Sequence, residues 1–89
     1  MKIRLDDPAR LGAVVRATRK AYKLRQDDTA ASLGLSENFL GKVERGGDTV
    51  QWGKLFQVLA GLGIWVDVDV PESVVPYLPA DLAERVRRS

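Results

Sequence analysis

The spacing of apolar and polar residues predicts a run of short amphipathic helices in the first two thirds of the chain. Asp7 and Pro8 form a helix start, because Asp is a good cap and Pro in the first turn loses no hydrogen bond. A first helix is therefore expected to follow Pro8. Its inner face would comprise residues that recur at helical spacing, namely Leu11, Val14, Val15, Thr18 and Tyr22.

Two more short helices joined by a tight turn are predicted between residues 24 and 46. The first is expected over Gln26 to Leu33 and the second over Glu37 to Arg45. Gly34 can adopt a positive φ to end the first helix, and Ser36 can cap the second. This layout is the one that places a helix in the DNA major groove, so it makes a DNA-binding repressor the first hypothesis.

The second of these helices has one apolar face and one polar face. Leu40 and Val43, three residues apart, would point inward. Glu37 and Asn38 in the first turn and Lys42 about one turn later would point outward. All three polar side chains can form hydrogen bonds with base edges.

Two residues of the same helix have alternative interpretations. Gly41 costs a helix about 1 kcal/mol relative to alanine, so it indicates close approach of another backbone or of DNA, unless it reflects neutral drift. Phe39 is either a contact to a thymine methyl group or part of the core, and we favour the core.

A fourth helix is expected after the glycines at 46 and 47, capped by Asp48 or Thr49. Gly61 and Gly63 would end it. Its apolar stripe would comprise Val50, Leu55, Phe56, Leu59 and Leu62. Trp52 with Phe56 resembles an aromatic platform for a base, but aromatic residues on such a stripe are more often core or dimer contacts.

The period then changes from helix to strand. Ile64, Val66, Val68 and Val70 alternate with Trp65, Asp67 and Asp69. A single strand must find a partner for its backbone groups, and the simplest partner is the same strand of a second subunit. Asp67 and Asp69 also suggest a metal site, but the alternation turns them to solvent and no third ligand is evident.

The last segment is expected to be a linker followed by a short helix. Pro71, Pro76 and Pro79 interrupt the chain, and residues 80–88 can form one helix. Its arginines at 85, 87 and 88 either contact phosphates or an acidic partner, or simply suit the negative end of the helix dipole. The predicted organisation is thus a DNA-binding domain over 1–63, a dimerisation strand over 64–70, and a linker and tail over 71–89.

Composition limits the function classes. A chain of 89 residues is one domain, near the size at which partner contacts add needed stability. It contains neither cysteine nor histidine, so thiolate sites and the usual general base are missing, and we expect no enzyme, metal or cofactor. It has no membrane-length apolar run and no signal-peptide core, so a cytosolic protein is expected.

Charge is distributed unevenly, although the net charge is only +2. Residues 1–46 hold ten Lys and Arg against six Asp and Glu, whereas residues 47–89 hold four against six. A basic first half is where phosphate contacts would be expected, but an excess of this size is also ordinary for a solvated surface.

A set of spaced motifs runs from about Leu11 to Val70. It comprises Leu11-Gly12, Val15-Arg16, Arg19-Lys20-Ala21, Leu24-x-Gln26, Phe39-Leu40, Val43-Glu44-Arg45-Gly46, Thr49, Gly53-Lys54, Val58-Leu59 and Leu62-Gly63. With these motifs the chain resembles the lambda-repressor-like (XRE) helix-turn-helix family, and within it the HipB-like antitoxin repressors. It departs from the family at Arg25, where Ser or Thr usually caps the helix, and at Thr29, where leucine is usual.

The resemblance implies a mainly α fold: a four-helix lambda-repressor-like domain followed by one β-strand that pairs across the two-fold axis of a dimer. The short C-terminal tail, which can be helical, lies outside the resemblance. It also implies that Arg19 pairs with Glu44, and that Gln26 bonds a phosphate and braces the recognition helix. HipB-like repressors bind a HipA-like kinase toxin and repress their own operon, so that toxin becomes an expected partner. Pairing at the strand would involve Ile64, Trp65, Val66, Val68 and Val70.

These lines lead to a homodimeric repressor that presents two recognition helices about 34 Å apart to a palindromic double-stranded operator. Asn38 would bond adenine, Glu37 would accept from a cytosine amino group or orient a neighbour, and Lys42 would donate to guanine or contact only phosphate. Ser36 and Arg45 are expected to clamp the DNA backbone. The alternatives are a stand-alone regulator without a toxin, and a protein-interaction module that has lost DNA binding, which the acidic Glu37 favours.

Overall fold

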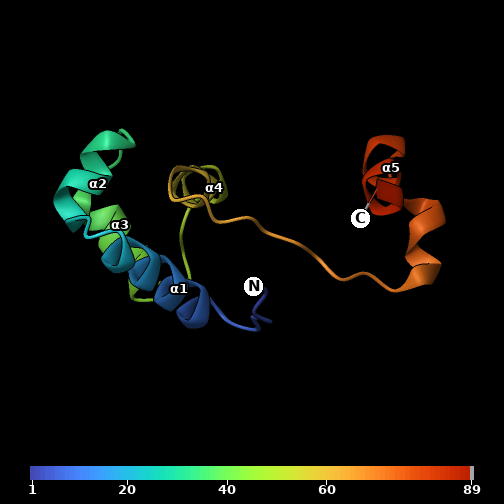
Figure 1. Cartoon of the computed structure of the whole chain (residues 1–89), viewed down its shortest axis with the longest axis horizontal. Helices are drawn as coiled ribbons and strands as arrows, with labels where there is room; N and C mark the ends of the chain where they lie inside the picture. The colour runs from blue at the N-terminus through green and yellow to red at the C-terminus, as the bar shows by residue number, and fades with distance from the viewer. Residues whose placement is uncertain (89) are drawn as a thin grey trace.

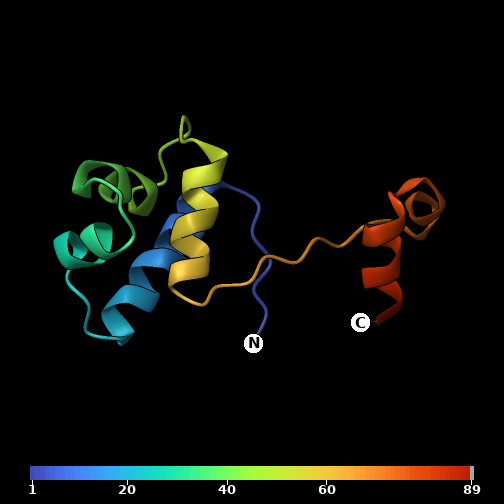
Figure 2. The ribbon, with the colours of Figure 1, turned by 90° about the horizontal axis from the view of Figure 1, so that it is seen from above.

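The computed structural model describes residues 1–88, and these are helical apart from short connections and two extended segments (Figures 1 and 2). Four helices form one domain, and a 3-10 helix with a fifth α-helix lies apart from it at the end of an extended segment. In chain order the elements are α1 (Pro8–Ala21), α2 (Gln26–Ser32), α3 (Glu37–Glu44), α4 (Trp52–Gly61), η1 (Glu72–Tyr77) and α5 (Ala80–Arg88).

The start of α1 confirms the predicted cap. Asp7 has an extended backbone, and its carboxylate accepts a hydrogen bond from the backbone N–H of Arg10 at 2.9 Å. Pro8 occupies the first turn. The orphan N–H groups of the helix start are thus partly satisfied by the residue just before it.

The turn between α2 and α3 also confirms the prediction. Gly34 takes a φ of +70°, and the backbone N–H of Leu35 closes the turn on the carbonyl of Ala30 at 2.9 Å. Ser36 then caps α3, because its Oγ accepts from the N–H of Phe39 at 3.0 Å. Helix α2 starts without such a cap, since Arg25 makes no side-chain cap bond.

The core lies between the four helices α1 to α4. Its buried apolar residues are Val15, Ala30, Leu40, Val43, Val58, Leu59 and Leu62. Gly12 of α1 lies directly against the end of α3: a Cβ atom there would overlap the carbonyl oxygen of Val43 and lie 2.8 Å from that of Glu44. The two helices can approach this closely only because position 12 has no side chain.

The predicted cap and stripe of α4 need correction. The helix begins at Trp52 after Gln51, without a side-chain cap, so neither Asp48 nor Thr49 caps it. Phe56 is 46% exposed and stacks on the 75% exposed Trp52. Phe56 points about a third of a turn away from the face shared by Leu55, Leu59 and Leu62, and Val58 is buried instead.

The predicted strand over residues 64–70 is also corrected. That segment runs as an extended connection after α4, and no β-strand occurs among residues 1–88. A strand is defined by its ladder of backbone hydrogen bonds, and a single chain offers this segment no such ladder. Pairing of the segment across a dimer stays a prediction.

The tail contains more structure than the prolines indicated. Residues 80–88 form α5 as predicted, but the linker before it contains η1, in which Pro76 is accommodated. Val75, Leu78 and Ala83 are half-buried where η1 meets α5. The side chains of Arg87 and Arg88, and all of Ser89, lie outside the described part of the chain, so the predicted role of these arginines stays open. None of the helices within residues 1–88 has the length and apolarity that crossing a membrane requires.

Candidate nucleic-acid interface

Helix α3 presents a polar stripe on the side opposite its buried residues. Leu40, Val43 and Glu44 are buried, whereas Asn38 and Arg45 are exposed. Positions 38, 42 and 45 follow each other at intervals of four and three residues, so they share one face of the helix. Local capping at Ser36 and close packing at Gly12 fix both ends of the helix that displays this face.

Lys42 is half-buried, and its ammonium group is already bonded within the chain. Its Nζ donates to the backbone carbonyl of Thr49 at 2.8 Å, in the loop that leads to α4. Gly47 lies against the side chain, because a Cβ there would be 3.1 Å from the Cε of Lys42. Lys42 therefore braces this loop in the free chain, and a contact to a base would require release of that bond.

Glu37 is exposed in the first turn of α3, close enough to Arg25 to influence it. The pKa of the Arg25 guanidinium is raised mainly by its side-chain hydrogen bond to Asp27, next by the charges of Asp27 and Asp28, and least by Glu37. Arg25 bonds Asp27 with its Nε at 3.1 Å and its Nη2 at 3.0 Å. The start of α2 is thus mixed in charge and predominantly acidic.

A buried ion pair joins α1 to the end of α3. The Nε and Nη2 of Arg19 donate to the two carboxylate oxygens of Glu44 at 2.7 and 2.9 Å, and the side chains are only 10% and 3% exposed. The Nη1 of Arg19 donates to the carbonyl of Leu24 at 2.8 Å. The pKa of Arg19 is raised, first by its hydrogen bond to Glu44. The structure thus contains the pair that the resemblance implied.

Gln26 belongs to the same cluster. Its Nε2 donates to an oxygen of Glu44 at 3.3 Å, which joins the start of α2 to the last turn of α3. Gly41 leaves room beside this amide: a Cβ there would lie 2.9 Å from the Nη1 of Arg45 and 3.7 Å from the amide of Gln26. The neighbours of Gly41 within the chain are therefore side chains, so the predicted approach of another backbone is wrong there, whereas the alternative approach of DNA stays a prediction. A close backbone approach occurs at Gly12 instead. That contact could not be predicted from the sequence, because it depends on the crossing of two helices.

Ser36 and Phe39 lie at the start of α3 with different surroundings. Ser36 is exposed, and its hydroxyl is at the cap, where backbone N–H groups point outward. Phe39 is half-buried and packs against the core, with the Nζ of Lys54 5.8 Å from its ring centre. This position favours the core interpretation of Phe39.

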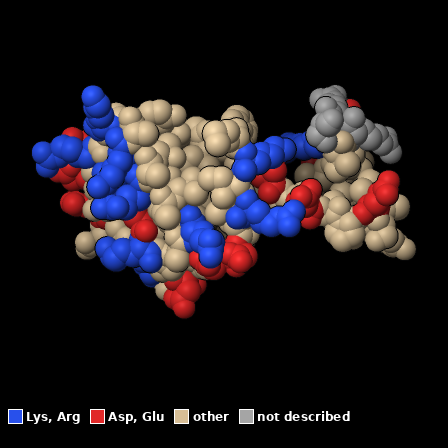
Figure 3. Space-filling view, turned by 60° about the horizontal axis from the view of Figure 1, so that its bottom comes forward, with Lys and Arg blue, Asp and Glu red and all other residues tan. Residues whose placement is uncertain are grey.

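Basic side chains gather on one end of the domain. Figure 3 shows one group of Lys and Arg over the end that lies away from η1 and α5, with acidic side chains among them, and a second group nearer the tail. Such a surface can attract a polyanion, although its excess of positive charge is modest.

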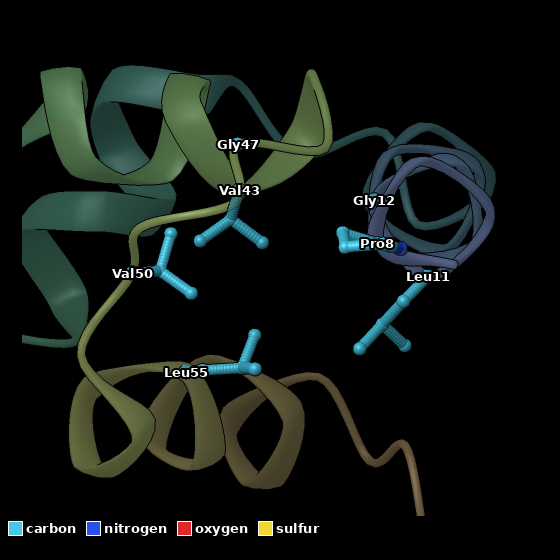
Figure 4. Close-up of a pocket in the computed structure, with 7 residues that line it drawn as sticks. All are labelled: Pro8, Leu11, Gly12, Val43, Gly47, Val50 and Leu55. Carbon is cyan, nitrogen blue, oxygen red and sulfur yellow. The ribbon is translucent and has the colours of Figure 1, made fainter. Parts of the chain in front are cut away.

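An apolar hollow between α1, α3 and α4 offers little as a ligand site (Figure 4). It has a cavity volume of about 30 Å³ and is lined by Pro8, Leu11, Gly12, Val43, Gly47, Val50 and Leu55. That is room for a water or two and far less than a small-molecule site needs. Within residues 1–88 no group of His, Cys, Asp or Glu gathers in a way that could hold a metal ion.

The predicted dimerisation residues are mostly open to solvent in the single chain. Trp65 is 90% and Val68 76% exposed, whereas Ile64 is half-buried against the core. Val66 and Val70 are also exposed. Together with Trp52 and Phe56 on α4, they leave a substantial apolar surface uncovered.

Two solved structures share this fold. A chain of the HipA-HipB-O2-O3 complex matches with a TM-score of 0.71 at 15% identity, over 80% of this chain and 100% of that one. The restriction-modification controller protein C.AhdI from Aeromonas hydrophila matches with a TM-score of 0.59 at 30% identity, over 66% of this chain and 86% of that one. The first likeness is one of fold alone.

Sequence similarity gives the family. No family model matches the chain. The uncharacterized HTH-type transcriptional regulator y4mF of Sinorhizobium fredii (strain NBRC 101917 / NGR234) is 42% identical over 71 residues, which cover 80% of this chain and 93% of that protein. Identity at this level over most of both proteins, on a scaffold with the helix-turn-helix geometry of α2 and α3, means that the chain belongs to the HTH-type transcriptional regulators.

Proposed function

We propose that the chain is a homodimeric repressor that reads an operator with α3. The observation that carries this proposal is the exposed stripe of Asn38 and Arg45 on a helix whose far end is anchored by the buried Arg19–Glu44 pair. A rigidly held helix with a polar outer face can enter the major groove in one fixed orientation.

Each side chain of the interface has a proposed role. Asn38 bonds an adenine edge, and Glu37 accepts from a cytosine amino group or orients a neighbour. Ser36 and Arg45 contact phosphates on either side of the groove. Lys42 donates to guanine or to a phosphate, and its bond to Thr49 makes the phosphate contact the smaller rearrangement.

Gln26 has a proposed contact of its own. It lies at the N-terminus of α2, where backbone N–H groups suit a phosphate oxygen, and its amide is held in place by Glu44. The carboxylates of Asp27 and Asp28 in the same turn repel a phosphate. The proposed contact therefore depends on a neutral donor, which the Gln26 amide supplies.

The dimer is proposed to form through residues 64–70. Exposure of Trp65, Val66, Val68 and Val70 supports it, because apolar side chains in an alternating pattern are costly to leave in water. A two-fold axis between paired strands would place both α3 helices on the same side of the dimer, where they can address successive major grooves. Hydroxyl-radical footprinting on the DNA upstream of the gene tests this arrangement: two protected faces about one helical turn apart support it, and one isolated face contradicts it.

The antitoxin role is proposed on similarity of fold. A structural neighbour of this chain comes from a complex of HipA, HipB and O2-O3, and a HipA-like kinase is therefore the partner to seek. Co-purification from the native host tests this: recovery of a kinase-like protein encoded beside this gene supports an antitoxin. Repeated recovery of the dimer without such a partner supports a stand-alone regulator.

A protein-interaction module that no longer binds DNA is the second candidate, and Glu37 is the observation that favours it. Its carboxylate is exposed on the reading side of α3, where it repels phosphates. Glu37→Gln should strengthen non-specific DNA binding if α3 enters the groove, whereas an unchanged affinity favours the interaction module.

As a member of a family of transcriptional regulators, the chain is not an enzyme.

A further inference from the structure

Two ion pairs join the first residues of the chain to the segment that follows α4, and the two segments cross in Figure 2. Lys2 and Asp67 form an ion pair with 3.6 Å between Nζ and Oδ2, and Arg4 and Asp69 form one with 3.9 Å between Nη2 and Oδ2. All four side chains are at least 70% exposed. Each pair alone therefore contributes little to stability. The spacing of the two pairs, however, indicates how the two segments are aligned.

The two ion pairs define a register. Both segments contribute every second residue, so positions 2 and 4 face positions 67 and 69 in the same chain direction. A period of two is the period of extended backbone, and successive side chains then alternate between faces. Parallel strands with a constant offset would produce this arrangement.

The apolar residues follow the same alternation. Ile3 lies between the two cations and Leu5 follows Arg4, just as Val66 precedes Asp67 and Val68 lies between the two aspartates. A ribbon made of both segments would therefore have one charged face and one apolar face. Ile3, Leu5, Val66 and Val68 are all exposed in the single chain, so this apolar face is not yet covered. No backbone hydrogen bond joins residues 1–6 to residues 64–70, so the pairing is incomplete as well.

Dimerisation through residues 64–70 would give Lys2 and Arg4 a role, which is to balance the aspartates that the two copies bring together. If the valines of both copies share one face, the Asp67 and Asp69 side chains of both copies share the other. Four carboxylates then lie on two adjacent strands, and like charges opposite each other destabilise a sheet. Lys2 and Arg4 of the two copies supply four cations to the same face.

The outer edge of the paired segment 64–70 also favours an additional strand beside it. A strand has two edges, and pairing with the second copy uses only one of them. The other edge would remain open to further chains unless it is covered. A short segment that includes Lys and Arg is the kind of edge strand that prevents further addition.

We propose that residues 1–5 form a parallel edge strand beside residues 66–70, which neutralises the aspartate face and closes the outer edge of a four-stranded sheet in the dimer. This inference rests on the proposed dimer. The occupant of the open edge is thus a segment of the same chain, and it is held there by charge pairing.

The test compares variants in which the charges of the two segments are reversed. The measured quantity is the dimer dissociation constant, determined by sedimentation equilibrium at low salt. Lys2→Glu with Arg4→Glu should weaken the dimer about 10-fold or more, since four cross-strand charge pairs are lost and replaced by repulsion. Adding Asp67→Lys and Asp69→Lys should restore most of the affinity. Lys20→Glu with Lys23→Glu makes the same change in net charge at exposed positions outside both segments, and should leave the constant unchanged.

Amide hydrogen exchange supplies a second readout. Residues 1–5 should be protected in the wild-type dimer and unprotected after the Lys2 and Arg4 reversal, with the helical core unaffected in both. A wild-type dimer that is indifferent to charge reversal and lacks this protection overturns the edge strand alone. A wild-type chain that stays monomeric overturns the dimer and the four-stranded sheet together.

Discussion

Arg19 and Glu44 are joined by two hydrogen bonds, of 2.7 and 2.9 Å, although 25 residues separate them in the chain. The pair ties the last turn of α1 to the last residue of α3, and Gln26 adds a third bond to the same carboxylate. Because both charges are buried, removal of either one leaves the other without a counter-charge, which lowers the stability of the fold. The orientation of the exposed face of α3, which we propose reads DNA, thus depends on an interaction that need not itself contact DNA.

Glu44→Ala should be strongly destabilising. The substitution leaves the buried Arg19 guanidinium without its counter-charge, and loss of one partner of a buried pair typically costs about 3–5 kcal/mol of unfolding free energy. Urea denaturation of the purified protein measures this. The double variant Arg19→Met, Glu44→Leu should recover a large part of the loss, since it removes both charges. A Glu44→Ala protein within about 1 kcal/mol of wild type would contradict the importance of the pair.

Gly12→Ala should also destabilise the fold, in spite of the better helix propensity of alanine. The new methyl group would meet the carbonyl oxygens of Val43 and Glu44, which are backbone atoms and cannot rotate away. Overpacking of this kind costs about 1–3 kcal/mol. Gly53→Ala in α4 is the matched control, because a Cβ there meets nothing within 4 Å. It should stabilise by about 0.5–1 kcal/mol, so the two substitutions should shift the melting temperature in opposite directions.

Asp7 should make the stability of α1 dependent on acid pH. Its pKa is lowered below the ordinary value of 3.8, first by the backbone hydrogen bond from Arg10. A lowered pKa in the folded state means that the contribution to stability is complete above the unfolded pKa and is lost as the pH falls through the folded pKa. Asp7→Asn retains a capping side chain that does not titrate. The wild type should therefore lose melting temperature relative to Asp7→Asn as the pH decreases from 5 to about 2, and parallel curves would contradict this role.

Local signals of the sequence predicted much of the fold correctly. The cap at Asp7, the positive φ of Gly34 and the cap at Ser36 each depend on a few adjacent residues, so they can be recognised in one dimension. The start of α4 could not be found in this way, because Gln51 has no capping bond to indicate it. Phe56 is exposed because it lies about 100° around the helix from Leu55, away from the buried Leu59 and Leu62.

Contacts between distant segments were the part that the sequence could not predict. The approach of Gly12 to Val43 and the bond from Lys42 to Thr49 both depend on how helices and loops are placed in three dimensions. The division of α3 into a buried and an exposed face was predictable because α3 is regular and its buried residues recur at helical spacing. The Arg19–Glu44 pair was expected only through a family resemblance, since spacing alone does not connect residues of two different helices.

The most direct test of the central claim is binding to the DNA upstream of the protein's own gene, compared with a scrambled duplex over a series of salt concentrations. The proteins to compare are wild type, the double variant Asn38→Ala, Lys42→Ala, and the control Lys20→Ala, Gln57→Ala, which removes a lysine and an amide from exposed positions outside α3. We expect wild type and control to prefer the native duplex. The Asn38 and Lys42 variant should retain only weak, salt-sensitive binding, with no preference between the native and the scrambled duplex. Equal binding of both duplexes by all three proteins, or no binding by any, would contradict it.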